Sequence, residues 1–174
     1  MDNFKATQLH TEILKAISEM GFQTPTPIQA KTIPHLMSSN QDLIATAQTG
    51  TGKTAAFGLP SIHLTNIKYN DTQTLVLCPT RELCIQIAKD LAKYSKYLNG
   101  INILAVYGGS DIRAQIKSLN KGAHIVIGTP GRTKDLIKRK KLNIGHIARI
   151  ILDEADEMLT MGFKEDLEMI LSHT

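Results

Sequence analysis

The chain has 174 residues, of which 42% are hydrophobic, so it can bury one core of its own and we expect a single folded domain over residues 1–174. Its two cysteines, Cys78 and Cys84, are too few for a disulfide framework or a tetrahedral zinc site. We expect both to be reduced and buried, with a reactive thiol as the alternative. No run approaches the roughly 20 apolar residues of a membrane span, and the first residues form no export signal, so we expect a soluble, cytoplasmic protein with no membrane partner.

The net charge of +4 is unevenly distributed along the chain. Residues 129–149 contain seven Lys or Arg and one Asp, a local charge of +6, which leaves the remainder at −2. A localised positive region suits a polyanion such as nucleic acid, and a solvated helix face is the alternative.

The chain begins with a helical pattern. Apolar residues recur at helical spacing over residues 8–20, and Gly21 is a suitable stop. Pro25 and Pro27 then predict an extended entry to a second helix, which has Pro27 in its first turn. Pro34 should bend or shorten that helix.

Five short runs rich in Val, Ile and Leu predict buried parallel strands. These runs are residues 43–47, 74–78, 103–107, 124–128 and 148–152. Helical patterns lie between them, including residues 81–94, 112–119 and 132–140. The alternation predicts the α/β class, with a mainly parallel sheet and helices on both faces.

The sequence AQTGTGKT at residues 47–54 follows the first predicted strand and precedes a helix. Gly50 and Gly52 let the backbone approach phosphate oxygens closely, and the helix N-terminus behind them favours negative charge. Lys53 then offers an ammonium group to the β- and γ-phosphates, and Thr54 offers a hydroxyl to Mg²⁺. The general P-loop pattern has glycine where this chain has Ala47, so a chance Gly-Lys-Thr in a strand-to-helix turn is the alternative.

The last predicted strand delivers two acids side by side, Asp153 and Glu154, with Asp156 shortly after them. A P-loop ATPase needs an acid to hold Mg²⁺ and a base for the attacking water, and these residues suit the two roles. An acidic helix start is the alternative. Three other strand ends carry the sequences PTREL, GGS and TPGR, at the edge where an open α/β sheet binds ligands.

Together these stretches resemble the first RecA-like domain of a DEAD-box RNA helicase, a P-loop NTPase domain. AQTGTGKT matches motif I, where alanine at position 47 is usual, and the PTREL, GG, TPGR and DEAD stretches match motifs Ia, GG, Ib and II. GFQTPTPIQ, with Phe4 upstream, matches the Q motif. The resemblance runs from Phe4 to nearly the C-terminus.

The resemblance implies a site for ATP and Mg²⁺. Gln29 would hydrogen-bond the adenine edge and select ATP over GTP, although an ordinary polar residue in a first helical turn is the alternative. Phe22 would pack against the base, with Thr24 close to it. The phosphates would be held by the loop residues Gln48, Thr49, Gly50, Thr51, Gly52 and Lys53.

The resemblance also assigns the catalytic groups. Thr54 and Asp153 would hold Mg²⁺, while Glu154 would position and deprotonate the hydrolytic water. Lys53 would act on the phosphates, and Asp156 would couple the nucleotide site to the rest of the domain.

The implied partner is the sugar-phosphate backbone of one RNA strand, bound without sequence preference. The residues that would contact it are Thr80, Arg81, Gly109, Arg113, Gln115, Thr129, Gly131 and Arg132. For Arg81 and Arg132 a local helix cap or salt bridge is the alternative. The run of residues 138–141, Lys-Arg-Lys-Lys, lies outside the motifs, and we interpret it as a solvated helix end where cations suit the dipole.

In this family a Ser-Ala-Thr strand and a second RecA-like domain with arginine fingers would follow beyond Thr174, and that strand would lie between the strands bearing Lys53 and Asp153. We therefore expect the domain to bind nucleotide weakly and hydrolyse it slowly or not at all. The expected function is ATP-dependent unwinding of short RNA duplexes by the whole protein. An ATP-dependent RNA clamp or ribonucleoprotein assembly factor is one alternative. A P-loop ATPase acting on DNA is another, which GFQTPTPIQ and TPGR disfavour.

Overall fold

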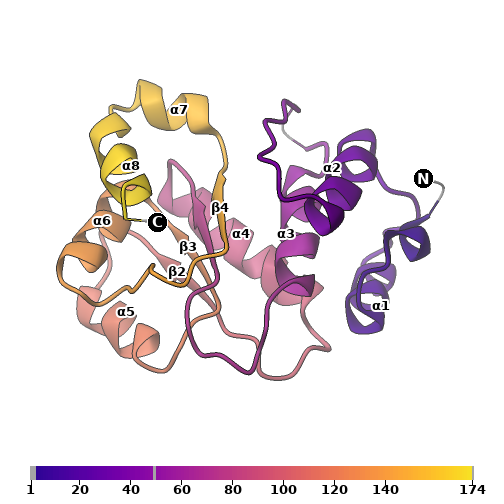
Figure 1. Cartoon of the computed structure of the whole chain (residues 1–174), viewed down its shortest axis with the longest axis horizontal. Coiled ribbons are helices and arrows are strands. Elements are labelled where there is room, and N and C mark those ends of the chain that lie inside the picture. Colours follow the sequence, from indigo (N-terminus) through magenta and orange to yellow (C-terminus); the bar gives the residue numbers. More distant parts are fainter. Residues whose placement is uncertain (1–2, 49, 174) are drawn as a thin grey trace. The chain divides into compact units, whose positions relative to one another are not determined.

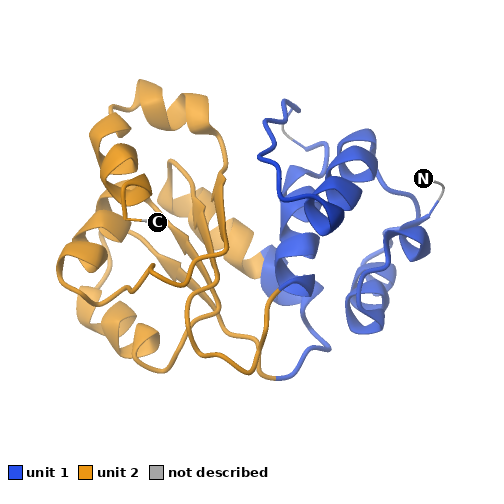
Figure 2. Ribbon diagram, in the orientation of Figure 1, with its two compact units in different colours: residues 1–64, 90–99 blue, residues 65–89, 100–174 orange. Residues whose placement is uncertain are grey.

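The computed structural model describes residues 3–48 and 50–173 and divides the chain into two compact units (Figure 2). The first unit comprises Met1–Leu64 and Asp90–Asn99, and the second comprises Thr65–Lys89 and Gly100–Thr174. The first unit is helical, whereas the second contains the β-sheet.

The first unit contains a short 3₁₀ helix and three α-helices that begin in it, labelled in Figure 1 where room allows. They are η1 (Phe4–Thr7), α1 (Thr11–Glu19), α2 (Pro27–Ser38) and α3 (Lys53–His63). The predicted N-terminal helix is confirmed: the apolar side of α1 is buried, and Gly21 ends the helix with a φ of 84°. The amide of Phe22 closes that end by donating to the Ile17 carbonyl over 3.0 Å.

Helix α2 begins at Pro27, as the sequence predicts, because proline fits the first helical turn. It continues past Pro34 to Ser38, so the predicted shortening is not found. The Ser38 hydroxyl donates to the Pro34 carbonyl over 2.8 Å, which gives the last turn a hydrogen bond of its own.

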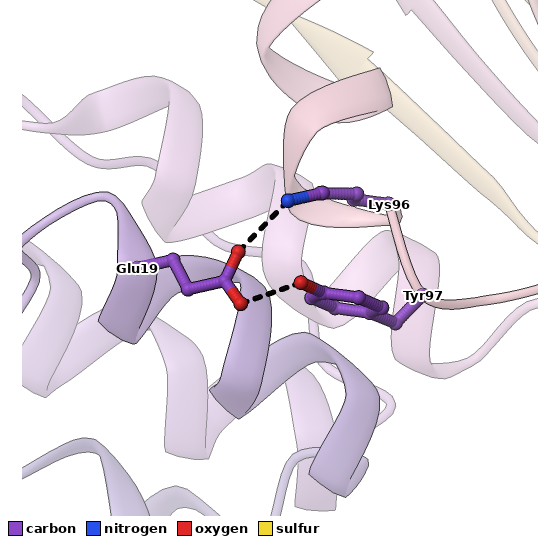
Figure 3. A network of polar contacts seen from close by, with 3 residues as sticks. All are labelled: Glu19, Lys96 and Tyr97. Atoms are coloured by element: carbon purple, nitrogen blue, oxygen red, sulfur yellow. Dashed lines mark hydrogen bonds and ion pairs between the residues drawn. The ribbon is translucent and has the colours of Figure 1, made fainter.

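The end of α1 is joined to the segment that follows residue 94 by a polar network (Figure 3). The Glu19 carboxylate accepts hydrogen bonds from Lys96 Nζ over 2.8 Å and from Tyr97 Oη over 2.5 Å. Lys15 Nζ lies 4.1 Å from the centre of the Tyr97 ring, in cation–π contact. The Lys96 ammonium, followed by the Tyr97 hydroxyl, lowers the pKa of Glu19, so the carboxylate stays charged and the network stays formed at neutral pH.

The second unit is built on four parallel strands in the order β2-β3-β1-β4. The strands are β1 (Thr74–Leu77), β2 (Ile103–Val106), β3 (Ile125–Gly128) and β4 (Arg149–Leu152). The remaining helices are α4 (Arg81–Tyr94), α5 (Ile112–Leu119), α6 (Pro130–Lys138), α7 (Ala155–Thr160) and α8 (Lys164–Leu171). Four predicted strands are thus confirmed to within a residue at each end. None of the helices that the structure describes is long and apolar enough to cross a membrane.

Helices cover both faces of this sheet, as the sequence predicts. One face carries Leu75, Leu77 and Val126, which join a buried cluster with residues of α6 and α8. Because side chains alternate along a strand, Ile127 belongs to the opposite face. Cys84 of α4 lies against that strand, with its Sγ 3.1 Å from the Ile127 carbonyl oxygen. The core of this unit is therefore formed on two sides of one sheet.

The prediction of a fifth strand over residues 43–47 is wrong. The structure assigns these residues to no strand, and Leu43 and Ile44 are 41% and 96% exposed. A strand needs a neighbour to pair its backbone N–H and C=O groups, and an apolar run alone does not supply one.

Candidate nucleotide and RNA sites

The glycine-bearing loop leads directly into a helix N-terminus. Gly50 and Gly52 have φ values of 79° and 89°, in the left-handed region that glycine adopts without strain. Helix α3 begins at Lys53, and the amide of Ala56 donates to the Gly52 carbonyl over 3.1 Å. The first turn of α3 therefore has the free N–H groups that bind anions, with Lys53 and Thr54 in that turn. Thr49 lies outside the described residues.

The side chain of Gln29 is tied to this loop. It is 3% exposed, its Oε1 accepts from the Thr26 amide over 3.0 Å, and its Nε2 donates to the Gly52 carbonyl over 3.1 Å. A Cβ added at Gly52 would overlap Gln29 Nε2. Gln29 is thus a buried amide that caps the first turn of α2, as an ordinary polar residue of a helix start would, and that also bonds to the loop. One N–H of Nε2 and one lone pair of Oε1 are left for a ligand.

The ring of Phe22 is held from two sides. Its centroid lies 6.0 Å from that of Phe4 and 6.1 Å from that of Tyr94, in an edge-on arrangement with Tyr94. Tyr94 is buried, and burial, followed by the charge of Asp90, raises its pKa to about 12. Phe22 itself is half-buried and Thr24 is exposed, so both can face a ligand on the loop between α1 and α2.

The acidic turn follows β4. The Asp153 amide donates to the Leu77 carbonyl over 2.9 Å, which continues the β1–β4 ladder, and Asp153 is 8% exposed. Glu154 precedes α7 with φ 56° and ψ 49°, a left-handed conformation that is uncommon outside glycine. Such conformations cluster at functional sites, where the surrounding structure maintains them. Asp156 is exposed in the first turn of α7.

The thiol of Cys78 lies near these acids but is not activated by them. A hydrogen bond with Cys84, burial, and the charges of Asp153 and Glu154 all raise the pKa of Cys78. Both cysteines are buried and free, as expected. The thiol therefore stays protonated, and the reactive-thiol alternative is not supported.

Two elements of the expected RNA site meet at Tyr107. Thr80 Oγ1 accepts from the Leu83 amide over 3.2 Å and so caps α4. The Arg81 guanidinium lies 5.1 Å from the centre of the Tyr107 ring. Gly109 adopts a φ of 76°, and an added Cβ there would lie 3.8 Å from Arg81 Nη1. The Arg81 guanidinium therefore lies over the Tyr107 ring beside the GG turn. Because the ring carries no net charge, this contact leaves the positive charge of Arg81 uncompensated.

Arg132 is oriented by neutral groups. Its Nη1 donates to Gln115 Oε1 over 2.8 Å and its Nη2 to the Ser110 carbonyl over 3.2 Å. Gln115 Nε2 in turn donates to Ser110 Oγ over 2.6 Å and to the Tyr107 carbonyl over 3.2 Å. Gln115 is 8% exposed, and both its amide oxygen and its amide nitrogen are hydrogen-bonded within the protein. It is therefore suited to positioning Arg132. The local salt bridge considered for Arg132 is replaced by hydrogen bonds that leave its charge available.

The remaining expected RNA contacts lie at helix starts. Thr129 directly precedes α6, and Gly131 is exposed in the first turn of that helix. A Cβ added at Gly131 would lie 3.6 Å from Asp166 Oδ2, at ordinary contact distance. Arg113 is exposed in the first turn of α5. Backbone N–H groups at a helix start suit phosphate oxygens, so these positions are chemically consistent with a nucleic-acid backbone.

The two units contain different sets of the expected site residues. The loop residues 47–54 and Gln29 belong to the first unit, whereas the acidic turn and all the expected RNA contacts belong to the second. Sequence reasoning missed Tyr94, which packs on Phe22, as well as the hydrogen bonds of Ser110 and Tyr107. Tyr94 is marked in the sequence only as an aromatic residue at the end of a predicted helix, and such a position does not reveal its partner.

Comparison with known proteins agrees with these features. A family model described as DEAD/DEAH box helicase matches residues 26–174. The chain is 51% identical to the DEAD-box ATP-dependent RNA helicase CshA of Geobacillus kaustophilus, over 99% of this chain and 37% of that protein. It is 48% identical to the ATP-dependent RNA helicase DeaD of Mycobacterium tuberculosis, over 98% of this chain and 30% of that protein.

A solved structure is similar over the same length. The crystal structure of a DEAD box protein from the hyperthermophile Methanococcus jannaschii matches with a TM-score of 0.94 and 45% identity, over 99% of this chain and 47% of that chain. The chain thus has the RecA-like fold, and it spans about a third of the length of the curated relatives it matches.

Proposed function

Because this chain belongs to the DEAD/DEAH box helicase family, we propose that it binds ATP with Mg²⁺ and the backbone of RNA, and that the whole protein couples ATP hydrolysis to local unwinding of short RNA duplexes. The observation that carries the proposal is the buried amide of Gln29, hydrogen-bonded to the carbonyl of Gly52 in the phosphate loop. This contact ties a base-reading group to a phosphate-binding group.

The free groups of Gln29 suit adenine. Adenine presents an N6 donor beside an N7 acceptor, whereas guanine presents two acceptors, O6 and N7. The spare lone pair of Gln29 Oε1 and the spare N–H of Nε2 match the adenine pattern and leave guanine with an acceptor facing an acceptor. Phe22 packs on the base and Thr24 lies beside it in this proposal.

The phosphates of ATP would lie on the loop and the first turn of α3. The backbone N–H groups of Gln48, Thr49, Gly50, Thr51, Gly52 and Lys53 would surround them, and the Lys53 ammonium would reach the β- and γ-phosphates. The Thr54 hydroxyl and the Asp153 carboxylate are the hard oxygen ligands that suit Mg²⁺, which neutralises phosphate charge when bound.

Glu154 would orient the attacking water and accept its proton, and Asp156 would couple the nucleotide site to the rest of the domain. Full turnover would also need arginine fingers from a second RecA-like domain, which raise such rates by about 10³ to 10⁵. The 174-residue chain would therefore bind nucleotide weakly and hydrolyse it slowly or not at all.

RNA would be held by charge and backbone groups. Arg81 and Arg132 are oriented by neutral partners and retain their charge for phosphates, and the helix starts at Thr129, which is half-buried, and at the exposed Arg113 would add backbone N–H groups. With no tryptophan and 5% aromatic residues, the chain offers little for base stacking, so RNA binding would be independent of sequence.

The test is calorimetric titration of the chain with ADP and with GDP in Mg²⁺, repeated for Gln29→Ala. We expect binding of ADP in preference to GDP by on the order of 10- to 100-fold, and loss of that preference in the variant. Gln41→Ala is the matched control, because Gln41 is an exposed glutamine of the same unit outside the Q-motif stretch. Equal binding of the two nucleotides by the unmodified chain would contradict the proposal.

A further inference from the structure

The cationic segment at the end of α6 is exposed and largely unpaired, as a solvated helix end would be, but its backbone conformation needs a separate explanation. Lys138, Arg139, Lys140 and Lys141 are all exposed. Arg139 Nε lies 2.7 Å from Asp135 Oδ1, so its charge is compensated. Among the residues that the structure describes, no carboxylate lies within ion-pair distance of the other three. Lys138, Lys140 and Lys141 are called the lysine cluster below.

Lys140 occupies a backbone position that normally belongs to glycine. Its φ is 56°, and the turn is closed by hydrogen bonds from the Lys140 amide to the Ile137 carbonyl over 2.8 Å and from the Lys141 amide to the Leu136 carbonyl over 2.9 Å. At the equivalent ends of α1 and α7 the chain has Gly21 and Gly162, each with a φ of 84°. A lysine in this conformation destabilises the fold relative to glycine.

The helix dipole accounts for a cation at Lys138 but not for the lysines at positions 140 and 141. The dipole acts on charges within the last turn of a helix, and Lys138 is the last residue of α6. Lys140 and Lys141 lie beyond that end, where glycine would close the helix with less strain. The buried side chains of Leu142 and Ile144 anchor the following segment in the core, so the turn holds the lysine cluster at a fixed place on the surface.

We propose that the lysine cluster is a second contact for the RNA backbone, at the opposite end of α6 from Thr129 and Arg132. The nine residues of α6 separate the two contacts by about 13 Å, the length of roughly four nucleotides of a stacked strand. Lysine ammonium groups bind phosphates as point charges and read no bases, as the proposed RNA site requires. The inference rests on the proposed RNA binding.

The test measures the affinity of the chain for a fluorescent 20-nucleotide oligouridylate between roughly 50 and 200 mM salt. Replacing the lysine cluster by alanine should weaken binding about tenfold or more at 50 mM salt and lower the slope of log affinity against log salt by about 2. The control replaces Lys5, Lys31 and Lys68, which are exposed and distributed elsewhere, and changes the net charge equally. It should change the affinity by less than about twofold. Equal effects of the two triple variants would overturn the proposal, since total charge alone would then explain both.

Lys140→Gly separates a binding role from a structural one. If the lysine contacts RNA, this variant should melt at a higher temperature and yet bind the oligouridylate several-fold more weakly. A higher melting temperature with unchanged RNA affinity would overturn the inference and leave the cluster to another partner, such as an acidic protein.

Arg132→Ala distinguishes this inference from the proposed function. If Arg132→Ala weakens RNA binding while the lysine variants bind like the unmodified chain, only the second contact is wrong. If the unmodified chain binds no RNA, both proposals fail.

Discussion

Gly52 is constrained twice, by its backbone and by its neighbour. Its φ of 89° favours glycine, and a Cβ there would overlap the Nε2 atom of Gln29. The first constraint follows from the phosphate-loop pattern in the sequence. The second could not be predicted, because Gln29 is 23 residues away along the chain and only the folded structure brings its amide to the Gly52 carbonyl.

Gly52→Ala should therefore damage stability and nucleotide selectivity together. Left-handed strain should lower the free energy of unfolding by about 1–2 kcal/mol, and displacement of Gln29 should weaken ADP binding at least about tenfold. Gly162→Ala is the control, since Gly162 has a φ of 84° with no neighbour to clash with. Chemical denaturation should show destabilisation of both variants, larger in Gly52→Ala because its Cβ also overlaps Gln29, and ADP titration should show loss of binding only in Gly52→Ala. Retention of full ADP selectivity in Gly52→Ala would show that Gln29 does not read the base.

At the scale of elements, α1 and α3 are joined by a histidine pair. The His10 amide donates to His63 Nδ1 over 3.1 Å, and the two rings stack with centroids 4.0 Å apart. Burial, followed by the charge of His10, lowers the pKa of His63. A protonated Nδ1 could not accept the His10 amide, so the contact requires the neutral ring.

Stability should consequently fall on acidification. The pKa of His63 is lower in the folded state than its ordinary value near 6.5, so the unfolded chain takes up the proton first. The stabilising contribution is complete above about pH 6.5 and decreases as the pH falls toward the folded pKa. Melting temperatures at pH 7.5 and 5.5 should differ more for the unmodified chain than for His63→Asn. His146→Asn, at an exposed histidine, should keep the full difference, and an unchanged difference in His63→Asn would exclude this histidine as its source.

Elements were predictable where the signal is local. Helices α4 and α5 have the predicted limits, because their apolar periodicity and starting residues lie within the helix. Helix α6 was predicted to end at Lys140 but ends at Lys138, because no glycine marks its left-handed cap. Residues 43–47 have the composition of a strand, yet strand formation depends on a neighbour that composition does not reveal.

At the scale of the whole molecule, the chemistry is divided between two compact units. Lys53 and Gln29 lie in the first unit, and Asp153 and Glu154 lie in the second. The proposed reaction needs Lys53 and Asp153 at one nucleotide, joined through its phosphates and Mg²⁺. Nucleotide binding should therefore change the protection of both units, and the contribution of the second unit should depend on Mg²⁺.

Amide hydrogen exchange can follow the two units separately. ADP with Mg²⁺, at about 100 times its Kd, should stabilise the chain by about 2.7 kcal/mol and slow exchange around both Lys53 and Asp153. ADP with a chelator should protect chiefly the segment around Lys53. Asp153→Asn should remove the Mg²⁺-dependent protection of its own segment and leave adenine selectivity in place, while Asp71→Asn, at an exposed aspartate of the same unit, should behave like the unmodified chain. Protection confined to the first unit in the presence of Mg²⁺ would remove Asp153 from the proposed metal site, because a carboxylate that binds the metal of a bound nucleotide must share its stabilisation.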